Sequence, residues 1–79
     1  MRRAAVSVMA NIAEGSKKKS LKEKKYFYET ADTSLEELKP YFYLCYDLEY
    51  INQSQGEELM KLVREVGGML GQLIKNIKY

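Results

Sequence analysis

The feature that most constrains the fold is the spacing of apolar residues, which recur every three or four positions in three separate stretches of the chain. This spacing places them on one face of an α-helix, because a helix completes a turn in about 3.6 residues. The sequence therefore predicts an all-α chain, an antiparallel helical bundle that holds three helices of a four-helix, up-and-down bundle. The helices are expected at about residues 1–14, 21–49 and 55–77, within a single domain that spans residues 1–79.

The first expected helix has a narrow stripe of small apolar side chains, against which other helices can pack closely. Gly15 is expected to end this helix in a left-handed conformation. Asn11 and Glu14 flank the stripe and are expected to hydrogen-bond to a neighbouring helix or turn. Met1 falls inside the periodic pattern with no capping residue before it, so we expect a further helix to be missing upstream. The stripe consists of Ala5, Val8, Met9, Ile12 and Ala13.

The second expected helix opens with a capping box, in which Ser20 is followed three residues later by Glu23. Pro40 lies inside its apolar pattern, where it removes a backbone donor. Because the pattern continues past this residue, we expect a kink between Glu36 and Pro40 rather than two helices. The core stripe of this helix is expected to contain Leu21, Tyr28, Ala31, Leu35, Leu38, Phe42 and Cys45.

The third expected helix opens with a second capping box, formed by Ser54 and Glu57. Three glycines in its interior cost about 1 kcal/mol each relative to alanine, which indicates that another backbone packs closely there. Its apolar face is broad, and together the three helices present more apolar surface than a monomer tolerates. A fourth helix or neighbouring subunits should cover it. The glycines are Gly67, Gly68 and Gly71.

Charge is distributed unevenly along the chain. Residues 1–25 contain eight basic and two acidic side chains, a net charge of +6, and the remainder carries −4 because the whole chain carries +2. Such a chain can bind polyanions at its basic part, or associate with copies of itself, basic surface to acidic surface. The sequence predicts RNA or DNA binding, and the alternative is a lysine run that is simply solvated. The candidate nucleic-acid-binding residues are Arg2, Arg3, Lys17, Lys18, Lys19, Lys22 and Lys25.

Aromatic residues suggest two further contacts. Next to the lysines, helical spacing sends Phe27 to the core and leaves Tyr26 as an exposed ring that can stack on unpaired bases. Four tyrosines cluster late in the second helix, and interfaces favour tyrosine because its ring buries apolar area while its hydroxyl keeps a polar partner. We interpret the cluster as an oligomer interface, with ordinary bundle packing and ligand stacking as alternatives. The cluster consists of Tyr41, Tyr43, Tyr46 and Tyr50.

Nothing in the composition favours catalysis. The chain has no histidine, and its one cysteine, Cys45, lies on the expected core stripe. The carboxylates of Glu29, Asp32 and Glu36 resemble a solvated helix face. We therefore predict no catalytic residue, no metal site, no cofactor and no small-molecule substrate. No apolar run approaches the roughly 20 residues that cross a bilayer, so no membrane association is expected, and one unpaired cysteine is typical of a cytoplasmic protein.

Several stretches are familiar. Residues 2–15, RRAAVSVMANIAEG, resemble the signature of the 23S rRNA-intervening sequence protein family, and the ending EVGGMLGQLI at residues 65–74 resembles a later block of the same family. The resemblance implies a four-helix bundle that assembles as a homopentamer and has no established enzymatic activity. Related bundle proteins accompany the reverse transcriptases of diversity-generating retroelements, where a basic pentamer binds nucleic acid.

Some positions depart from this pattern. Met9 stands where the family usually has proline, Thr33 and Glu49 stand where it usually has glycine, and Pro40 is unexpected. The leading hypothesis is a non-enzymatic, cytoplasmic, self-associating bundle that binds nucleic acid through its basic part. The alternative is a structural or adaptor module whose groove receives a partner helix.

Overall fold

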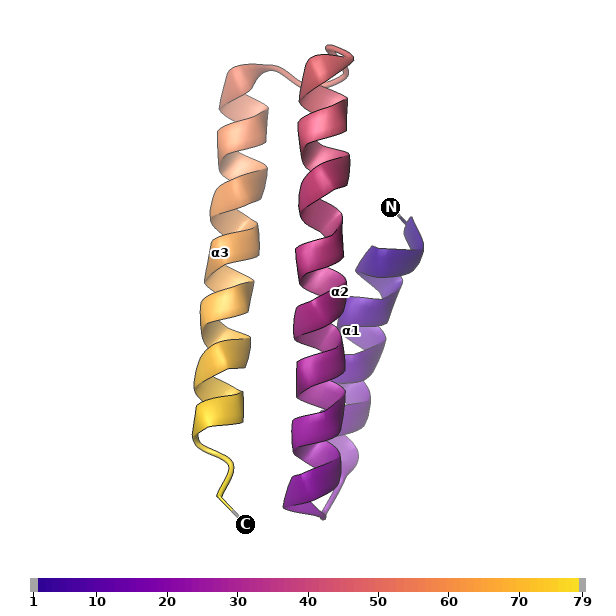
Figure 1. The fold of residues 1–79 in the computed structure, drawn as a ribbon, viewed down its shortest axis with the longest axis vertical. Helices are drawn as coiled ribbons and strands as arrows, with labels where there is room; N and C mark the ends of the chain where they lie inside the picture. The colour runs from indigo at the N-terminus through magenta and orange to yellow at the C-terminus, as the bar shows by residue number, and fades with distance from the viewer. Residues whose placement is uncertain (1, 79) are drawn as a thin grey trace.

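The computed structural model describes residues 2–78, which form three α-helices along a rod of 45 × 21 × 14 Å (Figure 1). These are α1 (Arg2–Lys17), α2 (Leu21–Asp47) and α3 (Gln53–Lys75). Consecutive helices run in opposite directions, which confirms the predicted all-α antiparallel bundle. The central helix is α2: both α1 and α3 pack against it, and within residues 2–78 no Cα atom of α1 lies within 8 Å of one of α3.

The beginning of α2 follows the predicted cap. The Ser20 hydroxyl accepts a hydrogen bond from the backbone N–H of Glu23 at 3.3 Å, which satisfies a donor that the first turn of a helix leaves free. The helix then continues through Pro40 without dividing in two, as expected.

The end of α2 is a Schellman motif. The N–H of Tyr50 donates to the carbonyl of Cys45 at 2.9 Å, and the N–H of Glu49 donates to the carbonyl of Tyr46 at 3.0 Å. This arrangement needs a left-handed residue, and Glu49 adopts it with a φ of 60°. The helix therefore ends at Asp47, two residues before the predicted boundary.

The beginning of α3 corrects the prediction of a Ser54–Glu57 capping box. The capping residue is Asn52, whose side chain accepts from the N–H of Gln55 at 2.8 Å. In return the Gln55 side chain accepts from the N–H of Asn52 at 2.9 Å. Both residue pairs have the spacing of a capping box, and the earlier pair lets the helix begin two residues sooner.

The role predicted for Gly15 is also wrong. Its φ is not positive, and α1 continues past it to Lys17. Gly15 is buried because α2 approaches its Cα closely: a Cβ there would lie 2.6 Å from Cε1 of Tyr28 and 3.3 Å from Cβ of Phe27. The glycine permits close approach between two helices, rather than an unusual backbone angle.

The core runs along α2, and three residues of the predicted apolar stripes, Met9, Ala13 and Leu21, lie outside it. Met9 is 66% exposed because Val8, one position away, faces α2 instead. Leu21 is exposed because it is the first residue of α2, beyond the end of α1. Phe42 and Cys45 are only half-buried, since α2 extends past the beginning of α1 (Figure 1). The buried apolar residues are Val8, Tyr28, Ala31, Leu35, Leu38, Val63 and Leu70.

Candidate nucleic-acid interface

One end of the rod gathers lysines from two parts of the chain. The turn between α1 and α2 lies at the same end as the last turn of α3 (Figure 1). Residues 14–25 contain six lysines and two glutamates, and Lys75 and Lys78 follow at the end of α3. We call these lysines, apart from Lys24, the lysine end: Lys17, Lys18, Lys19, Lys22, Lys25, Lys75 and Lys78.

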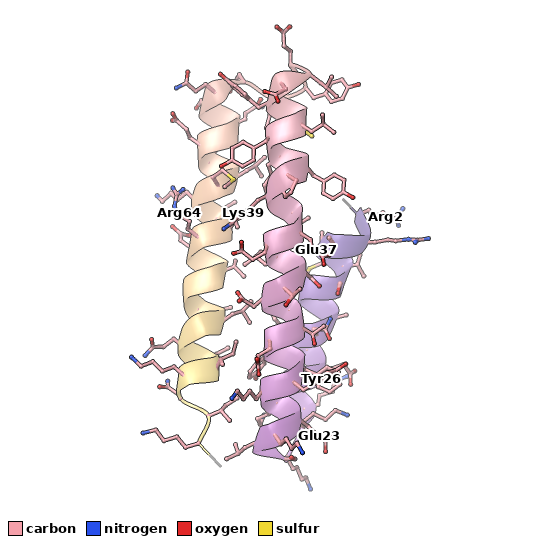
Figure 2. The ribbon with its side chains drawn as sticks, in the orientation of Figure 1. Arg2, Glu23, Tyr26, Glu37, Lys39 and Arg64 are labelled. Carbon is pink, nitrogen blue, oxygen red and sulfur yellow. The ribbon has the colours of Figure 1, made fainter. Side chains whose placement is uncertain are left out.

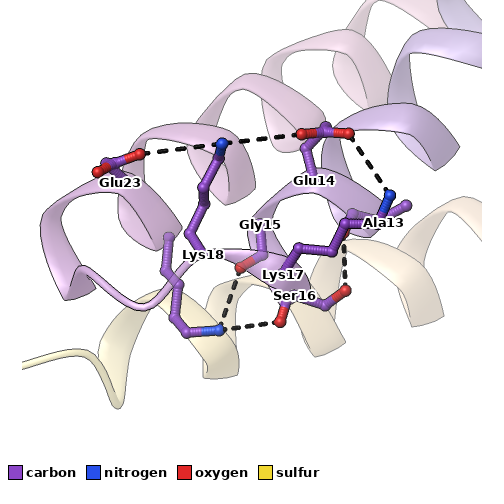
Figure 3. A network of polar contacts seen from close by, with 8 residues as sticks. Ala13, Glu14, Gly15, Ser16, Lys17, Lys18 and Glu23 are labelled. Carbon is purple, nitrogen blue, oxygen red and sulfur yellow. Dashed lines mark hydrogen bonds and ion pairs between the residues drawn. The ribbon is translucent and has the colours of Figure 1, made fainter.

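Some basic groups at this end are held in place by local contacts (Figure 3). The ammonium of Lys18 lies 3.9 Å from a Glu14 oxygen, 4.0 Å from a Glu23 oxygen and 5.3 Å from the centre of the Phe27 ring. The ammonium of Lys24 donates to the carbonyls of Gly15 and Ser16, at 3.1 and 3.3 Å, and so caps the end of α1. Lys24 is therefore mainly structural.

Three other lysines near the turn, Lys17, Lys19 and Lys22, are more accessible. Lys17 forms a long ion pair with Glu14, at 3.8 Å, and its side chain is mostly exposed. Within residues 2–78 Lys19 and Lys22 are exposed and have no polar partner, whereas Lys25 is half-buried and does have a contact. Exposed ion pairs contribute about 0–1 kcal/mol, so a phosphate can replace the glutamate at little cost.

Of the two aromatic residues beside the lysines, Tyr26 is exposed as predicted, but Phe27 does not belong to the core as expected. Tyr26 is 65% exposed, whereas Phe27 is half-buried under α1. Their rings meet edge to face, with centroids 5.2 Å apart, and this contact orients the Tyr26 ring. An exposed, oriented ring within reach of several ammonium groups is the arrangement on which unpaired bases stack in single-strand-binding proteins.

The structure does not bring Arg2 and Arg3 to the lysine end. They begin α1, whose 16 residues span roughly 24 Å at about 1.5 Å per residue. Figure 2 shows Arg2 well separated along the rod from Tyr26 and Glu23. The predicted set therefore divides into a group of lysines and a separate pair of arginines.

Lys75 and Lys78 were not among the predicted nucleic-acid-binding residues. Their contribution follows from the antiparallel arrangement, because the end of the third helix must return to the turn between the first two. The helix count alone was therefore enough to find them.

The opposite end of the rod is acidic and aromatic. Residues 40–60 contain Asp47, Glu49, Glu57 and Glu58 and no lysine or arginine. A hollow of about 480 Å³ opens there between α2 and α3. Of the four predicted interface tyrosines, all of which are exposed, Tyr43 and Tyr46 line this hollow, together with Phe42, Asp47, Gln53, Gly56, Glu57, Met60 and Arg64.

Other kinds of site find no support among residues 2–78. These residues hold no group of three cysteine or carboxylate side chains that would bind a metal ion. None of their helices has the length and apolar character required to span a bilayer.

The comparisons with known proteins give one result. The sequence pattern of the 23S rRNA-intervening sequence protein family matches residues 1–72, whereas no curated protein and no solved structure matches the chain. The match covers both stretches that resemble this family, RRAAVSVMANIAEG and nearly all of EVGGMLGQLI. With 72 of 79 residues matched, the chain belongs to the 23S rRNA-intervening sequence protein family.

Proposed function

We propose that this chain is a non-enzymatic, cytoplasmic helical-bundle protein that associates with copies of itself and binds RNA or DNA through its lysine end. The observation that carries the binding proposal is the convergence of the α1–α2 turn and the end of α3 at one end of the rod. Flexible ammonium groups neutralise phosphates without requiring a defined geometry, which suits a turn and a helix end.

The proposed binding mode is electrostatic and independent of sequence. The described residues at this end offer ammonium groups for phosphates and one exposed ring, that of Tyr26, for a base. Each phosphate contact with a single strand should lower the logarithm of the binding constant by about 0.7 per tenfold increase in salt. The family name, which mentions 23S rRNA, agrees with an RNA ligand.

The test is a salt titration with a fluorescent single-stranded oligonucleotide, of RNA and then of DNA. We expect binding at low ionic strength that weakens steeply as salt is added. The variant Lys19→Gln/Lys22→Gln should bind several-fold more weakly, with a shallower salt dependence. The control Lys39→Gln/Lys61→Gln removes the same charge from the middle of the rod and should bind nearly as well as the wild type.

Two results would contradict the proposal. One is the absence of a complex at low salt, and the other is a complex whose affinity does not change with salt. Equal losses in the two double variants would show that net charge, rather than the lysine end, governs binding. An adaptor role for the bundle would then be the better interpretation.

A further inference from the structure

The helix α1 is apolar on both of its sides. Val8 and Gly15 face α2 and are buried. On the outward side, Val6 and Met9 are 52% and 66% exposed, and Ala10 and Ala13 are exposed beside them. These four residues are three and four positions apart, so they form one continuous face. We call Val6, Met9, Ala10 and Ala13 the outward face of α1.

The polar residues of α1 do not interrupt this face. Ser7 and Asn11 are half-buried toward α2, where the Ser7 hydroxyl lies 2.9 Å from that of Ser34. An exposed apolar patch on a helix, bounded by polar residues, marks an interaction surface. The outward face of α1 therefore has the composition of a buried surface, although nothing within residues 2–78 covers it.

The hollow between α2 and α3 has the matching composition. Its apolar lining comes from Phe42, Tyr43, Tyr46 and Met60. Gly56 also lines it and has no side chain to fill the space. Aromatic and methionine side chains around a depression are typical of the central part of a protein interface.

Charge supports the same match. Arg2 and Arg3 lie at the beginning of α1, which has no acidic residue in its first turn, so two positive charges oppose the helix dipole. The structure gives them no acidic partner among residues 2–78. Asp47, which lines the hollow, has no partner there either, and Glu57 accepts only from the Gln53 amide, at 3.1 Å.

The lengths agree as well. Arg3 and Glu14, at the two ends of the outward face, are 11 residues apart, and so are Gln53 and Arg64, at the two ends of the hollow on α3. Both spans correspond to about 16 Å of helix. If the arginines lie at Asp47 and Glu57, the other end of α1 brings Glu14 toward Arg64. Opposite charges then meet at both ends of the contact.

We propose that the outward face of α1 in one copy of the chain packs into the hollow between α2 and α3 of a second copy. The inference rests on the self-association in the proposed function and names the two surfaces that meet. It also assigns Arg2 and Arg3 to this contact.

The contact joins two different surfaces. Ser34 of α2 faces α1, whereas Tyr43 lines the hollow. These residues are nine positions apart, or about 2.5 helical turns, so they lie on opposite sides of α2. One copy can therefore offer α1 to one neighbour and its hollow to another. Such head-to-tail contacts build a ring or a filament rather than a two-fold dimer.

The first test compares two substitutions of exposed methionines. Met9 lies on the outward face of α1, and Met69, 49% exposed on α3, does not line the hollow. Light scattering should give the wild type a mass of several chains. Met9→Glu should reduce the mass to 9.2 kDa, that of a single chain, while Met69→Glu should keep the wild-type mass. Circular dichroism should show equal helix content in both variants.

The second test uses complementation. Met9→Glu keeps an intact hollow, and Tyr43→Glu keeps an intact outward face. Each variant alone should be monomeric. An equimolar mixture should form a species of twice the chain mass and no larger, because the two variants can make one sound contact between them and no second one.

The outcomes separate this inference from the proposed function. A wild-type oligomer that survives Met9→Glu, or variants that remain monomeric when mixed, would overturn the contact named here but leave self-association standing. A wild-type chain that is monomeric at every concentration would overturn both. Nucleic-acid binding is measured separately and depends on neither result.

Discussion

The hydroxyl oxygens of Ser7 and Ser34 lie 2.9 Å apart and form a hydrogen bond that links α1 to α2. Ser34 is buried, and Ser7 also accepts from the Asn11 amide at 3.1 Å. The amide of Asn11 donates to the Ser7 carbonyl as well, at 2.7 Å. The polar residues of α1 are thus used to fix its register on α2.

Ser34→Ala should lower the free energy of unfolding by about 1 kcal/mol, because the half-buried Ser7 hydroxyl loses its partner across the helix pair. The Ser7→Ala/Ser34→Ala variant should recover part of this loss, since removing both partners leaves neither one unsatisfied. Urea unfolding followed by circular dichroism measures the stability of the two single variants, Ser7→Ala and Ser34→Ala, and of the double variant. Strict additivity of the two single changes would show that the hydroxyls do not interact.

Gly15→Ala should destabilise the chain by roughly 1–2 kcal/mol, because the added methyl group displaces the buried Tyr28 ring, and the better helix propensity of alanine offsets only part of that cost. Gly68 is the matched control, since a Cβ there meets nothing within 4 Å. Gly68→Ala should stabilise the helix by about 0.5–1 kcal/mol. Thermal unfolding should shift in opposite directions for the two variants, and a shift in the same direction would contradict the close approach at Gly15.

Glu49→Gly should stabilise the chain by about 1 kcal/mol, because Glu49 has a φ of 60°, which glycine adopts without strain. For a chain of this size the melting temperature should rise by about 4–8 °C. Glu49→Ala is the informative control, since it removes the carboxylate but keeps the Cβ, and it should not raise the melting temperature. A similar gain in both variants would mean that charge, not backbone conformation, is the cause.

Lys75→Gln/Lys78→Gln should weaken nucleic-acid binding, although these lysines are at least 55 residues from the α1–α2 turn in sequence. If both contact phosphates, the slope of log affinity against log salt should fall by about 1–2. Binding that is unchanged by this double substitution would restrict the interface to the turn.

The sequence predicted the fold class and most of the core, because helical periodicity is a local property that tertiary contacts reinforce. The cap at Ser20 and the exposure of Tyr26 were predicted for the same reason. Asn52 and Ser54 could not be separated, since both precede a residue that completes a capping box, and only the course of the preceding turn decides between them. From the sequence alone, a glycine that ends a helix cannot be distinguished from one, such as Gly15, that a neighbouring helix approaches closely.

The candidate site was predicted less completely. The lysine run near the turn can be recognised in the sequence, but the residues that each lysine contacts cannot. In the structure the ammonium of Lys18 lies between two glutamates and over the ring of Phe27. Arg2 and Arg3 were grouped with the lysines because they are close in sequence. Helical geometry separates them, because α1 has 16 residues and its two ends lie roughly 24 Å apart.

In the part of the chain that the structure describes, α1 and α3 both pack on α2, and no Cα atom of one comes within 8 Å of a Cα atom of the other. The helix α2 therefore belongs to two helical hairpins, α1–α2 and α2–α3. We expect either outer helix to detach from α2 while the other outer helix stays packed. Amide protons of α1 and of α3 should then exchange with solvent through separate local openings rather than through one common event. Substitutions on the two outer helices should have additive effects on stability wherever they contact different residues of α2.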